Sequence, residues 1–580
     1  MAVEKLIVDH IDTWTTALQT RSTAGRGSSG KIDLYGIKKL RELILELAVR
    51  GKLVPQDPND EPASVLLERI AAEKAELVKQ GKIKKQKPLP EISEEEKPFE
   101  LPAGWGWVRL GTLFNSIQSG GTPSKINPAF WGGDIPWASV KDLGSSQYIS
   151  KTQDYITEAG LLSGSKLADS GDVLICTRMG LGKIAIASCP IAFNQDLKAV
   201  KLTSHIIPNF FFNTYSTVKI KGTGTTVEGI KQEQLVNYIT GFPPFNEQNK
   251  IVVKVKELMS LCDQLEQHTL TSLDAHQQLV ETLLTTLTDS QNADELAENW
   301  ARISKHFDTL FTTEASIDAL KQTILQLAVM GKLVPQDPND EPASELLKRI
   351  AQEKAQLVKD GKIKKQKPLP PVNDEDKLFE IPFNWEHVYL NDICEVITDG
   401  THQTPKYTDR GRPFISAQCV KPFKFMPENC RYVSEEDYQQ YIKNRTPEIN
   451  DILLARVGAG IGECAVIDVN LEFSIYVSTA LIKPIKCHIN SNYLCLWLNS
   501  PIGRLFSSRY TYGKGVSQGN LNLSLIRTFV ISIPPYKEQN LIVEKVRTYL
   551  SICEKLKSKI QSAQQTQLHL ADALTEAAIN

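Results

Sequence analysis

In two long stretches of the sequence, mostly apolar residues recur at alternating four- and three-residue steps, and we call these positions the seam. The first runs from Ile251 to Leu283 and the second from Ile542 to Leu574. This spacing places the seam on one side of an α-helix and is typical of a coiled coil. We therefore predict two long helices. The seam residues expected to contact another helix or a partner subunit are Leu258, Leu265, His276, Leu279, Tyr549, Leu556, Gln567 and Leu570.

Shorter helical patterns lie closer to the N-terminus. Apolar residues recur at helical spacing over Ile37–Val49, and a second amphipathic stretch covers Ala63–Gln80. Gly51 and Gly81 follow these stretches, and glycine suits the left-handed position that ends a helix.

Strand-like apolar runs occur between the helical stretches. The predicted strands are Val173–Thr177, Ala185–Ala187, Ile452–Val457 and Ala465–Val469, with glycines between the members of each pair.

Much of the helical frame is duplicated. The sequence GKLVPQDPNDEPAS begins at Gly51 and again at Gly331, and GKIKKQKPLP begins at Gly81 and again at Gly361. Each copy leads to a Pro-x-x-Trp sequence, and each long helical stretch is preceded by Pro-Pro-Phe/Tyr-x-Glu-Gln. The segments 105–241 and 385–532 share only sparse landmarks. A repeated frame that carries two divergent inserts suggests a common assembly role with two different ligand sites.

The repeats divide the chain into five parts and indicate a mixed α+β fold. We expect two α/β insert domains separated by a scaffold of antiparallel long helices in a coiled coil, with an internal pseudo-twofold repeat. The expected parts are an N-terminal scaffold at 1–100, a first insert at 101–244, a central helix with the second repeat copy at 245–380, a second insert at 381–535 and a C-terminal coiled-coil helix at 536–580.

The composition is that of an ordinary soluble protein, with 41% hydrophobic and 23% charged residues and a net charge of −2. No long apolar run predicts a membrane span, and the first ten residues do not resemble a signal peptide. The ten cysteines contain no C-x-x-C pair. We therefore expect reduced thiols, no metal site and a cytoplasmic location.

Three motifs resemble catalytic signatures but lack a feature that the chemistry needs. Gly25–Lys31 has P-loop spacing, but Ile32 replaces the magnesium-binding Ser or Thr and no strand is expected before it. The Pro-Pro motifs are preceded by Phe242 and Ile533, where an amino-DNA methyltransferase needs a polar side chain. The glycines of Gly458–Gly462 fit a hairpin turn better than a nucleotide loop. No catalytic residue is therefore assigned.

Polar side chains on glycine-rich or turn segments of the inserts are the candidates for DNA contact. By count, the net charge is +3 over 105–241 and +1 over 385–532. Arg and Lys bind phosphate and guanine, and Gln reads adenine. The candidates are Lys125, Arg178, Lys183, Lys219, Lys221, His402, Lys406, Arg410, Arg456, Lys514 and Gln518.

The chain resembles the specificity (S) subunit of type I restriction-modification systems, and most closely the IB branch. The paired repeats, the Pro-x-x-Trp starts, the Pro-Pro-Phe/Tyr-x-Glu-Gln motifs and the heptad helices carry this resemblance over the whole chain. It implies that each insert is a target-recognition domain for one half of a bipartite, asymmetric site in double-stranded DNA.

The resemblance also implies the partners of a bacterial or archaeal complex. Two methylation (M) subunits would bring S-adenosylmethionine and adenine methylation, and two restriction (R) subunits would bring ATP, Mg and cleavage. The S subunit itself would be non-catalytic and hold no cofactor. Long helices would set the spacer between the half-sites, and we expect an insertion between Asp289 and Ala301 to lengthen that spacer.

Two other functions remain open from the residues alone. A self-sufficient DNA methyltransferase would transfer methyl groups without a partner. An adaptor that joins two proteins without binding DNA fits the near-neutral charge. A transfer assay and a gel shift distinguish these alternatives.

Overall fold

The chain forms two compact units, each with one copy of the repeated frame and one insert. The computed structural model describes residues 3–21, 31–144, 146–220, 222, 229–443, 445–512 and 519–579. Unit 1 comprises Met1–Arg21, Lys31–Leu270 and Gln564–Asn580, and unit 2 contains Thr271–Ala563. The two longest helices, α8 (Phe245–Asp289) and α17 (Tyr536–Ile579), each contribute to both units.

The scaffold of unit 1 joins the first repeat copy to the C-terminal end of the chain. Its helices are α1 (Val3–Asp9), α2 (Ile11–Thr16), α3 (Tyr35–Val49) and α4 (Ala63–Lys79), together with the first part of α8 and the last part of α17. Leu40 of α3, Ile251 of α8 and Ala571 of α17 are fully buried in one core. At its edge, the Tyr35 hydroxyl donates to the Asp572 carboxylate at 2.7 Å.

Unit 2 repeats this arrangement with the second copy. Its scaffold contains α9 (Ala293–Lys305), α10 (Phe307–Leu310), α11 (Glu314–Val329) and α12 (Ala343–Lys359), with the last part of α8 and the first part of α17. Leu284 of α8, Ile317 of α11 and Ile542 of α17 share its core. Within each unit the start of one long helix therefore packs in the same core as the end of the other, as expected for antiparallel helices.

The buried stripe on both long helices shifts by one residue at equivalent places. Along α8 the buried or half-buried positions follow alternating four- and three-residue steps as far as Thr269, but the four-residue step that ends there is followed by another, to Leu273. On α17 the four-residue step that ends at Ile560 is likewise followed by another, to Gln564. A straight helix drifts against a strict heptad by about 20° per seven residues, and an extra four-residue step absorbs that drift.

The shift turns two of the predicted seam residues away from the helices of this chain, while their contact with a partner subunit stays a prediction. Leu279 is 51% exposed and Leu570 is 45% exposed, while their neighbours Val280 and Ala571 are buried. The strict heptad spacing therefore placed these residues one position away from the true stripe.

The other six predicted seam residues face the chain's own cores. Leu258 is buried, and Leu265, Tyr549 and Leu556 pack against the cores of their units. The His276 ring lies 3.2 Å from the carbonyl of Thr309, and Gln567 is half-buried. A second protein is not needed to explain their positions.

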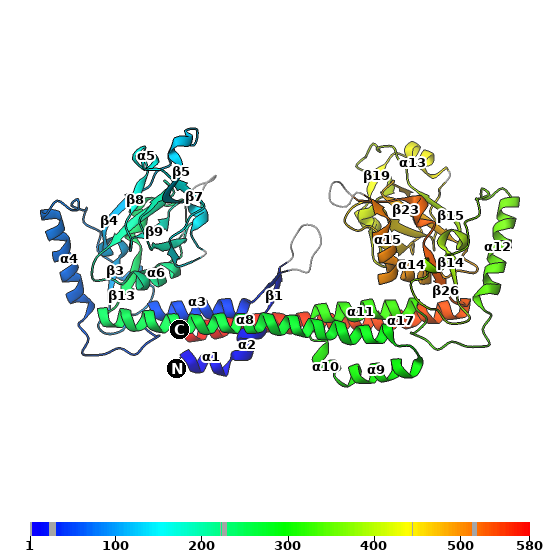
Figure 1. Ribbon diagram of the computed structural model, residues 1–580, viewed down its shortest axis with the longest axis horizontal. Coiled ribbons are helices and arrows are strands. Elements are labelled where there is room, and N and C mark those ends of the chain that lie inside the picture. The colour runs from blue at the N-terminus through cyan, green and yellow to red at the C-terminus, as the bar shows by residue number, and fades with distance from the viewer. Residues whose placement is uncertain are drawn as a thin grey trace. The chain divides into compact units, whose positions relative to one another are not determined.

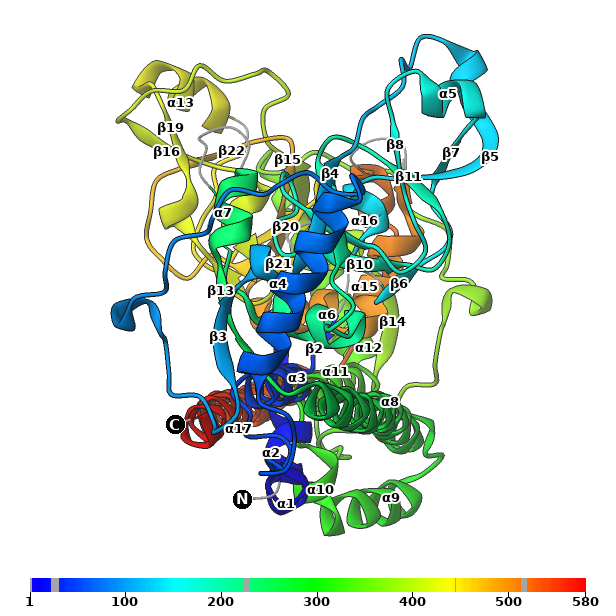
Figure 2. The same ribbon diagram turned by 90° about the vertical axis from the view of Figure 1, so that its left-hand side faces the viewer.

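The described residues of the first insert form two small sheets, one further pair of strands and three α-helices. One sheet has the order β4-β12-β9-β10-β6 and the other β7-β5-β11-β8. The strands are β3 (Gly106–Arg109), β4 (Phe114–Ser119), β5 (Trp131–Ala138), β6 (Tyr148–Ile149), β7 (Asp154–Ile156), β8 (Lys166–Ala168), β9 (Val173–Cys176), β10 (Ile184–Ala187), β11 (Ile191–Phe193), β12 (Leu197–Leu202) and β13 (Ile239–Phe242); the helices are α5 (Glu158–Leu162), α6 (Pro208–Thr217) and α7 (Gln232–Asn237). Helix α6 packs on α3 of the scaffold (Figures 1 and 2).

The second insert has the same central sheet pattern, in the order β15-β23-β20-β21, beside a smaller sheet β19-β16-β22. Its strands are β14 (Glu386–Tyr389), β15 (Cys394–Asp399), β16 (Arg412–Ile415), β17 (Val420–Lys421), β18 (Lys424–Phe425), β19 (Arg431–Val433), β20 (Ile452–Ala455), β21 (Cys464–Val466), β22 (Ser474–Ile475), β23 (Thr479–Pro484), β24 (Thr511–Tyr512), β25 (Asn520–Leu521) and β26 (Val530–Ile533); its helices are α13 (Glu435–Ile442), α14 (Ser491–Asn499), α15 (Pro501–Arg509) and α16 (Leu523–Ile526). Helices α14 and α15 pack on α11.

Each insert is closed by a pair of strands formed from its two ends. β3 pairs with β13, and β14 pairs with β26, both antiparallel. The Pro-Pro motifs follow β13 and β26 directly and lead into α8 and α17. Each Pro-Pro motif therefore marks the end of a strand directly before a long helix, and this position accounts for it without a methyltransferase site.

The repeated motifs meet in a hydrogen-bond network around a buried glutamate at this junction. In unit 2, Trp385 Nε1 donates to Glu538 Oε2 at 3.0 Å, and Gln336 Nε2 donates to Glu538 Oε1 at 3.1 Å. Trp105, Gln56 and Glu247 make the equivalent bonds in unit 1, at 2.9 and 3.2 Å. Three separate repeated motifs are thus explained by one structural junction.

The glycine that begins each long repeat is required by close packing at the same junction. Gly51 and Gly331 have positive φ, at 67° and 74°. A Cβ atom on them would lie 2.5 Å from Pro102 Cγ and 2.4 Å from Pro382 Cγ, respectively. No larger side chain fits there without moving the Pro-x-x-Trp segment.

Two predictions about glycine-rich segments have different outcomes. Gly458–Gly462 lies in a hairpin between antiparallel β20 and β21, as predicted. The expectation that no strand precedes Gly25–Lys31 is wrong, because β1 (Gln19–Arg21) pairs with β2 (Lys31–Asp33) on either side of it. Residues 22–30, which include 25–30 of the P-loop-like sequence, lie outside the described residues.

No helix in the described part of the chain is both long enough and apolar enough to cross a membrane.

Burial of Glu538 leads to a pH-dependent prediction. Burial raises the pKa of this carboxyl above its ordinary 4.5, and the hydrogen bonds from Gln336 and Trp385 oppose the rise. Folded unit 2 therefore binds this proton more tightly than the unfolded chain does. The resulting stabilisation is present below pH 4.5 and is lost as the pH rises through the raised pKa. We expect the unfolding free energy of E538Q to improve relative to the unsubstituted chain across that window.

Denaturant unfolding of both proteins at a series of pH values measures this difference. A difference that stays constant with pH would contradict the assignment of the raised pKa to Glu538.

Candidate nucleic-acid interface

Three loops of the first insert meet beside the ends of β4, β9 and β11. We call residues 120–127, 177–183 and 194–196 the first loop cluster. The Gly121 amide donates to the Phe193 carbonyl at 2.9 Å, and the Thr177 amide donates to the Asp196 carbonyl at 2.9 Å. The Thr122 hydroxyl donates to the Gln195 side chain. These bonds hold the three loops next to one another, and together the loops present a polar surface.

Two exposed side chains at the centre of this cluster suit recognition of DNA. The Arg178 side chain is 52% exposed and lies 3.7 Å from the Asp196 carboxylate. Gln195, next to Asp196, is exposed. Arginine can donate two hydrogen bonds to guanine, and a glutamine amide can both donate to and accept from adenine. Sequence reasoning missed Gln195, because only its position between β11 and β12 brings it beside Arg178.

The other candidates of the first insert lie in different surroundings. Lys125 is exposed on a turn of the same cluster. Lys183 is half-buried, and its Nζ donates to the Val140 carbonyl at 3.2 Å. Lys219 is exposed after α6, outside the cluster as defined. Lys221 lies outside the described residues.

The second insert has an equivalent second loop cluster, formed by residues 399–411, 456–462 and 476–478. The Thr401 amide donates to the Ile475 carbonyl at 3.0 Å, and the Arg456 amide donates to the Ser478 carbonyl at 2.8 Å. His402, Lys406 and Arg410 are exposed on the first of these loops. His402 lies 3.2 Å from the Asp399 carboxylate, measured from its Nε2.

Arg456 has a structural role in this cluster and is removed from the DNA-contact candidates. Its side chain is only 7% exposed and forms an ion pair with Asp399. Its Nε donates to the Leu521 carbonyl at 2.9 Å, and its Nη1 donates to the Val477 carbonyl at 3.2 Å. An arginine enclosed in this way fixes the loops and leaves little of its surface for contact with DNA. Lys514 and Gln518 lie outside the described residues.

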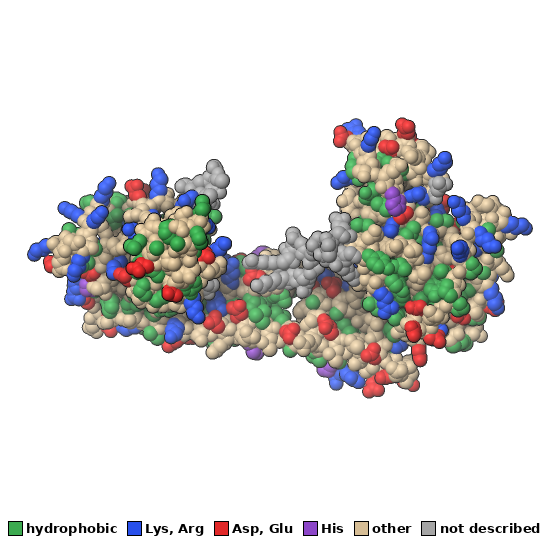
Figure 3. All heavy atoms as spheres, turned by 45° about the horizontal axis from the view of Figure 1, so that its top comes forward, with side chains coloured by type: hydrophobic (Ala, Val, Ile, Leu, Met, Phe, Trp, Pro, Cys, Tyr) green, Lys and Arg blue, Asp and Glu red, His purple; other side chains and the backbone are tan. Residues whose placement is uncertain are grey.

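An aromatic side chain within the second loop cluster adds a stacking surface. Tyr407 is 44% exposed, and the guanidinium of Arg431 lies over its ring at 4.5 Å from the centroid. Figure 3 shows Lys and Arg side chains spread over the visible face of each insert, among uncharged and acidic ones. The charge pattern therefore favours several separate phosphate contacts over one continuous basic groove.

The comparisons with known proteins identify the family. A family model described as the type I restriction modification DNA specificity domain matches residues 102–275 and 382–563. The chain is 48% identical to the type I restriction enzyme EcoAI specificity subunit of Escherichia coli, with all of both chains covered. This chain belongs to the family of type I restriction enzyme specificity subunits. The EcoEI specificity subunit of the same species is 47% identical, again over the whole of both chains.

A solved specificity subunit is similar at a greater distance. The crystal structure of the HsdS subunit from Thermoanaerobacter tengcongensis has 18% identity and a TM-score of 0.38, and it covers 83% of this chain and 98% of that one. Each segment matched by the family model includes one insert and the start of the helix that follows it. The resemblance to specificity subunits that was inferred from the repeats is therefore confirmed, while the IB branch stays a prediction.

Proposed function

We propose that this specificity subunit reads a bipartite DNA site with its two loop clusters, one half-site for each insert. The supporting observation is that equivalent loops of the two inserts carry different exposed polar residues on a repeated frame. Arg178 and Gln195 stand in the first cluster, and His402, Lys406 and Arg410 in the second. Two inserts that recognise different base sequences would give an asymmetric DNA site.

Arg178 offers a direct test of the first cluster. Its replacement by alanine removes an exposed guanidinium and leaves the Thr177 and Asp196 backbone bond intact. We expect R178A to lower specific DNA affinity by about 1–3 kcal/mol, the usual worth of a bidentate base contact. Gel shifts with the complete complex on its methylated site measure this loss.

Arg69 provides a matched control on the scaffold. Its side chain is 55% exposed and pairs with Glu61 at 2.7 Å, much as Arg178 pairs with Asp196. R69A removes the same charge away from the loops and should leave the affinity within about twofold. Equal losses in both variants would mean that Arg178 contributes only general charge.

The same proposal extends to the partners. Family membership makes this chain the specificity subunit, so it assembles with methylation and restriction subunits of a type I system. We propose two of each, an affiliation with the IB branch, and a non-catalytic role in which the partners hold S-adenosylmethionine, ATP and Mg. Support comes from the duplicated scaffold, since two equivalent junctions offer two equivalent docking surfaces.

Two assays separate this role from the alternatives. The chain alone, given S-adenosylmethionine and DNA, should transfer no methyl group, and addition of the methylation subunit should start transfer. A gel shift with duplex DNA should appear with the complex. Methyl transfer by the chain alone would restore the methyltransferase alternative, and the absence of any shift would restore the adaptor.

A further inference from the structure

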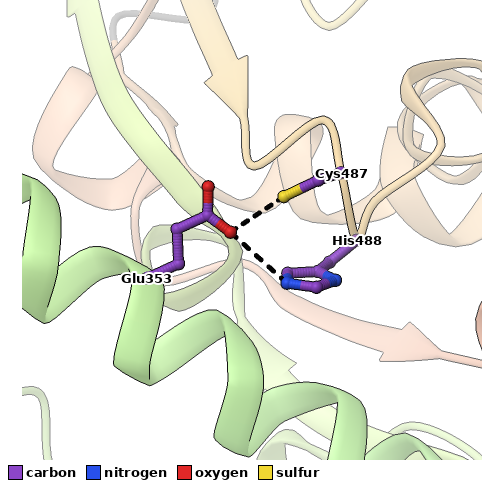
Figure 4. Close-up of side chains that lie close together, drawn as sticks. All are labelled: Glu353, Cys487 and His488. Carbon is purple, nitrogen blue, oxygen red and sulfur yellow. Dashed lines mark hydrogen bonds and ion pairs between the residues drawn. The ribbon is translucent and has the colours of Figure 1, made fainter.

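A thiol, an imidazole and a carboxylate meet at the base of the second insert. Glu353 projects from α12, and Cys487 and His488 project from the segment between β23 and α14 (Figure 4). Cys487 Sγ donates to Glu353 Oε2 at 2.8 Å, and His488 Nε2 lies 3.3 Å from the same oxygen. The three potential ligand atoms all lie within 4.8 Å of one another.

This geometry is close to that of three ligands on one small cation. Zinc binds sulfur at about 2.3 Å and nitrogen or carboxylate oxygen at about 2.0–2.2 Å, so tetrahedral ligand atoms lie about 3.3–3.7 Å apart. Only small side-chain movements would be needed to place all three atoms around an ion. Thiolate and imidazole favour zinc over magnesium or calcium, and a carboxylate oxygen is also an ordinary zinc ligand.

Unit 1 contains the same arrangement with one decisive difference. Glu73 of α4 lies 3.9 Å from His205 Nε2, and the Ser204 hydroxyl donates to Glu73 Oε2 at 2.7 Å. The frame thus repeats the carboxylate and the histidine, but a hydroxyl stands where unit 2 has the thiol of Cys487. Neutral hydroxyls are not among the usual protein ligands of zinc.

A second replacement makes the unit 2 site more negative. Asn115 donates to Glu73 at 2.7 Å in unit 1. The equivalent strand position in unit 2 is Glu395, whose charge acts on the Cys487 thiol. Lys486, beside Cys487, is paired with Asp451 at 2.8 Å and Glu448 at 3.3 Å, so its positive charge is already balanced.

We propose that Glu353, Cys487 and His488 bind one zinc ion, with the fourth position open to solvent beside the exposed Cys487. The ion would join α12 of the repeated frame to the second insert. Partial loss of water around the sulfur, with the hydrogen bond and charge of Glu353, raises the pKa of the metal-free Cys487 thiol to about 11. Zinc binding therefore releases the thiol proton to solvent and replaces the S–H···O bond with a Zn–S bond.

Zinc content of the full-length chain tests the site. The protein is stripped with a chelator, incubated with zinc, dialysed and analysed by mass spectrometry of the metal. We expect one zinc per native chain and none in C487S, which reproduces the serine of unit 1. C189S removes a half-buried thiol of the first insert and should retain the zinc. Native protein that retains no more zinc than C487S would overturn the proposal.

Two further readouts locate the ion and do not depend on DNA binding. Cobalt in place of zinc should give a thiolate charge-transfer absorption in native protein and C189S, and none in C487S. Zinc should slow alkylation of Cys487 at least tenfold while leaving Cys189 unchanged. In E353Q, which keeps the thiol, zinc affinity should fall at least tenfold. If the native protein binds zinc but the rate of Cys487 alkylation does not change, the ion lies elsewhere and the assignment is overturned.

Discussion

Four residues inserted into both long helices are expected to lengthen the DNA spacer by about two base pairs without changing either half-site. α8 has 45 residues and α17 has 44, so each spans about 66 Å at ~1.5 Å per residue. Four added residues extend a helix by about 6 Å and turn its end by about 40°. Two base pairs extend DNA by about 7 Å and turn it by about 70°. The lengths therefore match, and the rotations of the helix and the DNA differ by only about 30°.

The insertion points are set by the shift in the buried stripe. We insert four residues after Thr269 of α8 and four after Ile560 of α17. At these places each helix already has two four-residue steps in succession between buried positions, and the insertion adds a third. Seven residues at these places serve as a contrast. They add about 10 Å, or about three base pairs, but turn the helix by only about −20° while the DNA turns by about 100°. We expect that variant to lose specific binding.

An insertion in the loop after α8 serves as the control, because this loop lies within the segment in which the sequence alone predicted a longer spacer. An insertion between Asp289 and Ala301 was expected from the sequence to lengthen the spacer. α8 ends at Asp289 and α9 begins at Ala293, so added residues there enter a loop or a separate helix. Four residues inserted at Ser290 should leave the spacer unchanged. Sequencing of methylated sites reads all three variants, and an unaltered spacer in the double-helix variant would exclude the helices as the ruler.

Replacement of Trp385 by alanine is expected to destabilise unit 2 by about 3–5 kcal/mol. The side chain is 3% exposed, packs edge-on against Tyr493 and donates to Glu538. Its removal leaves a large cavity and takes a hydrogen bond from a buried carboxylate. Hydrogen exchange followed by mass spectrometry should show faster exchange in the amides of unit 2.

Two further variants separate packing from hydrogen bonding. W385F keeps most of the ring volume and removes the N–H donor, so it should cost about 1–3 kcal/mol. Trp105 is the unit 1 counterpart but is only half-buried, so W105A should cost less than W385A. Similar exchange rates in W385A and the native chain would show that the repeated junction does not stabilise the unit.

Repetition in the sequence predicted the scaffold well. Identical segments must fold alike, so the two frames, the helices after Gly51 and the strand before each Pro-Pro could be placed without coordinates. The strands around Gly458–Gly462 were also predicted, because short, mostly apolar runs beside glycines have few other solutions. Leu279 and Leu570 were misplaced because a heptad written in sequence does not include the drift of a straight helix.

The candidate DNA-binding surface was predicted less completely. Charge and glycine content located the loops but could not distinguish exposed Arg178 from Arg456, which Asp399 and backbone carbonyls enclose. Gln195 carries no charge and stood out only after the loops were assembled. Glu353 is 134 residues from Cys487, so no local spacing pointed to their contact.

The most direct test is a map of methylated adenines in DNA modified by the native complex, read by single-molecule sequencing. Two unlike readers on one duplicated frame predict a single asymmetric motif in which two short specific elements are separated by a spacer of constant length. A continuous motif, two identical half-sites or a spacer of variable length would contradict this account.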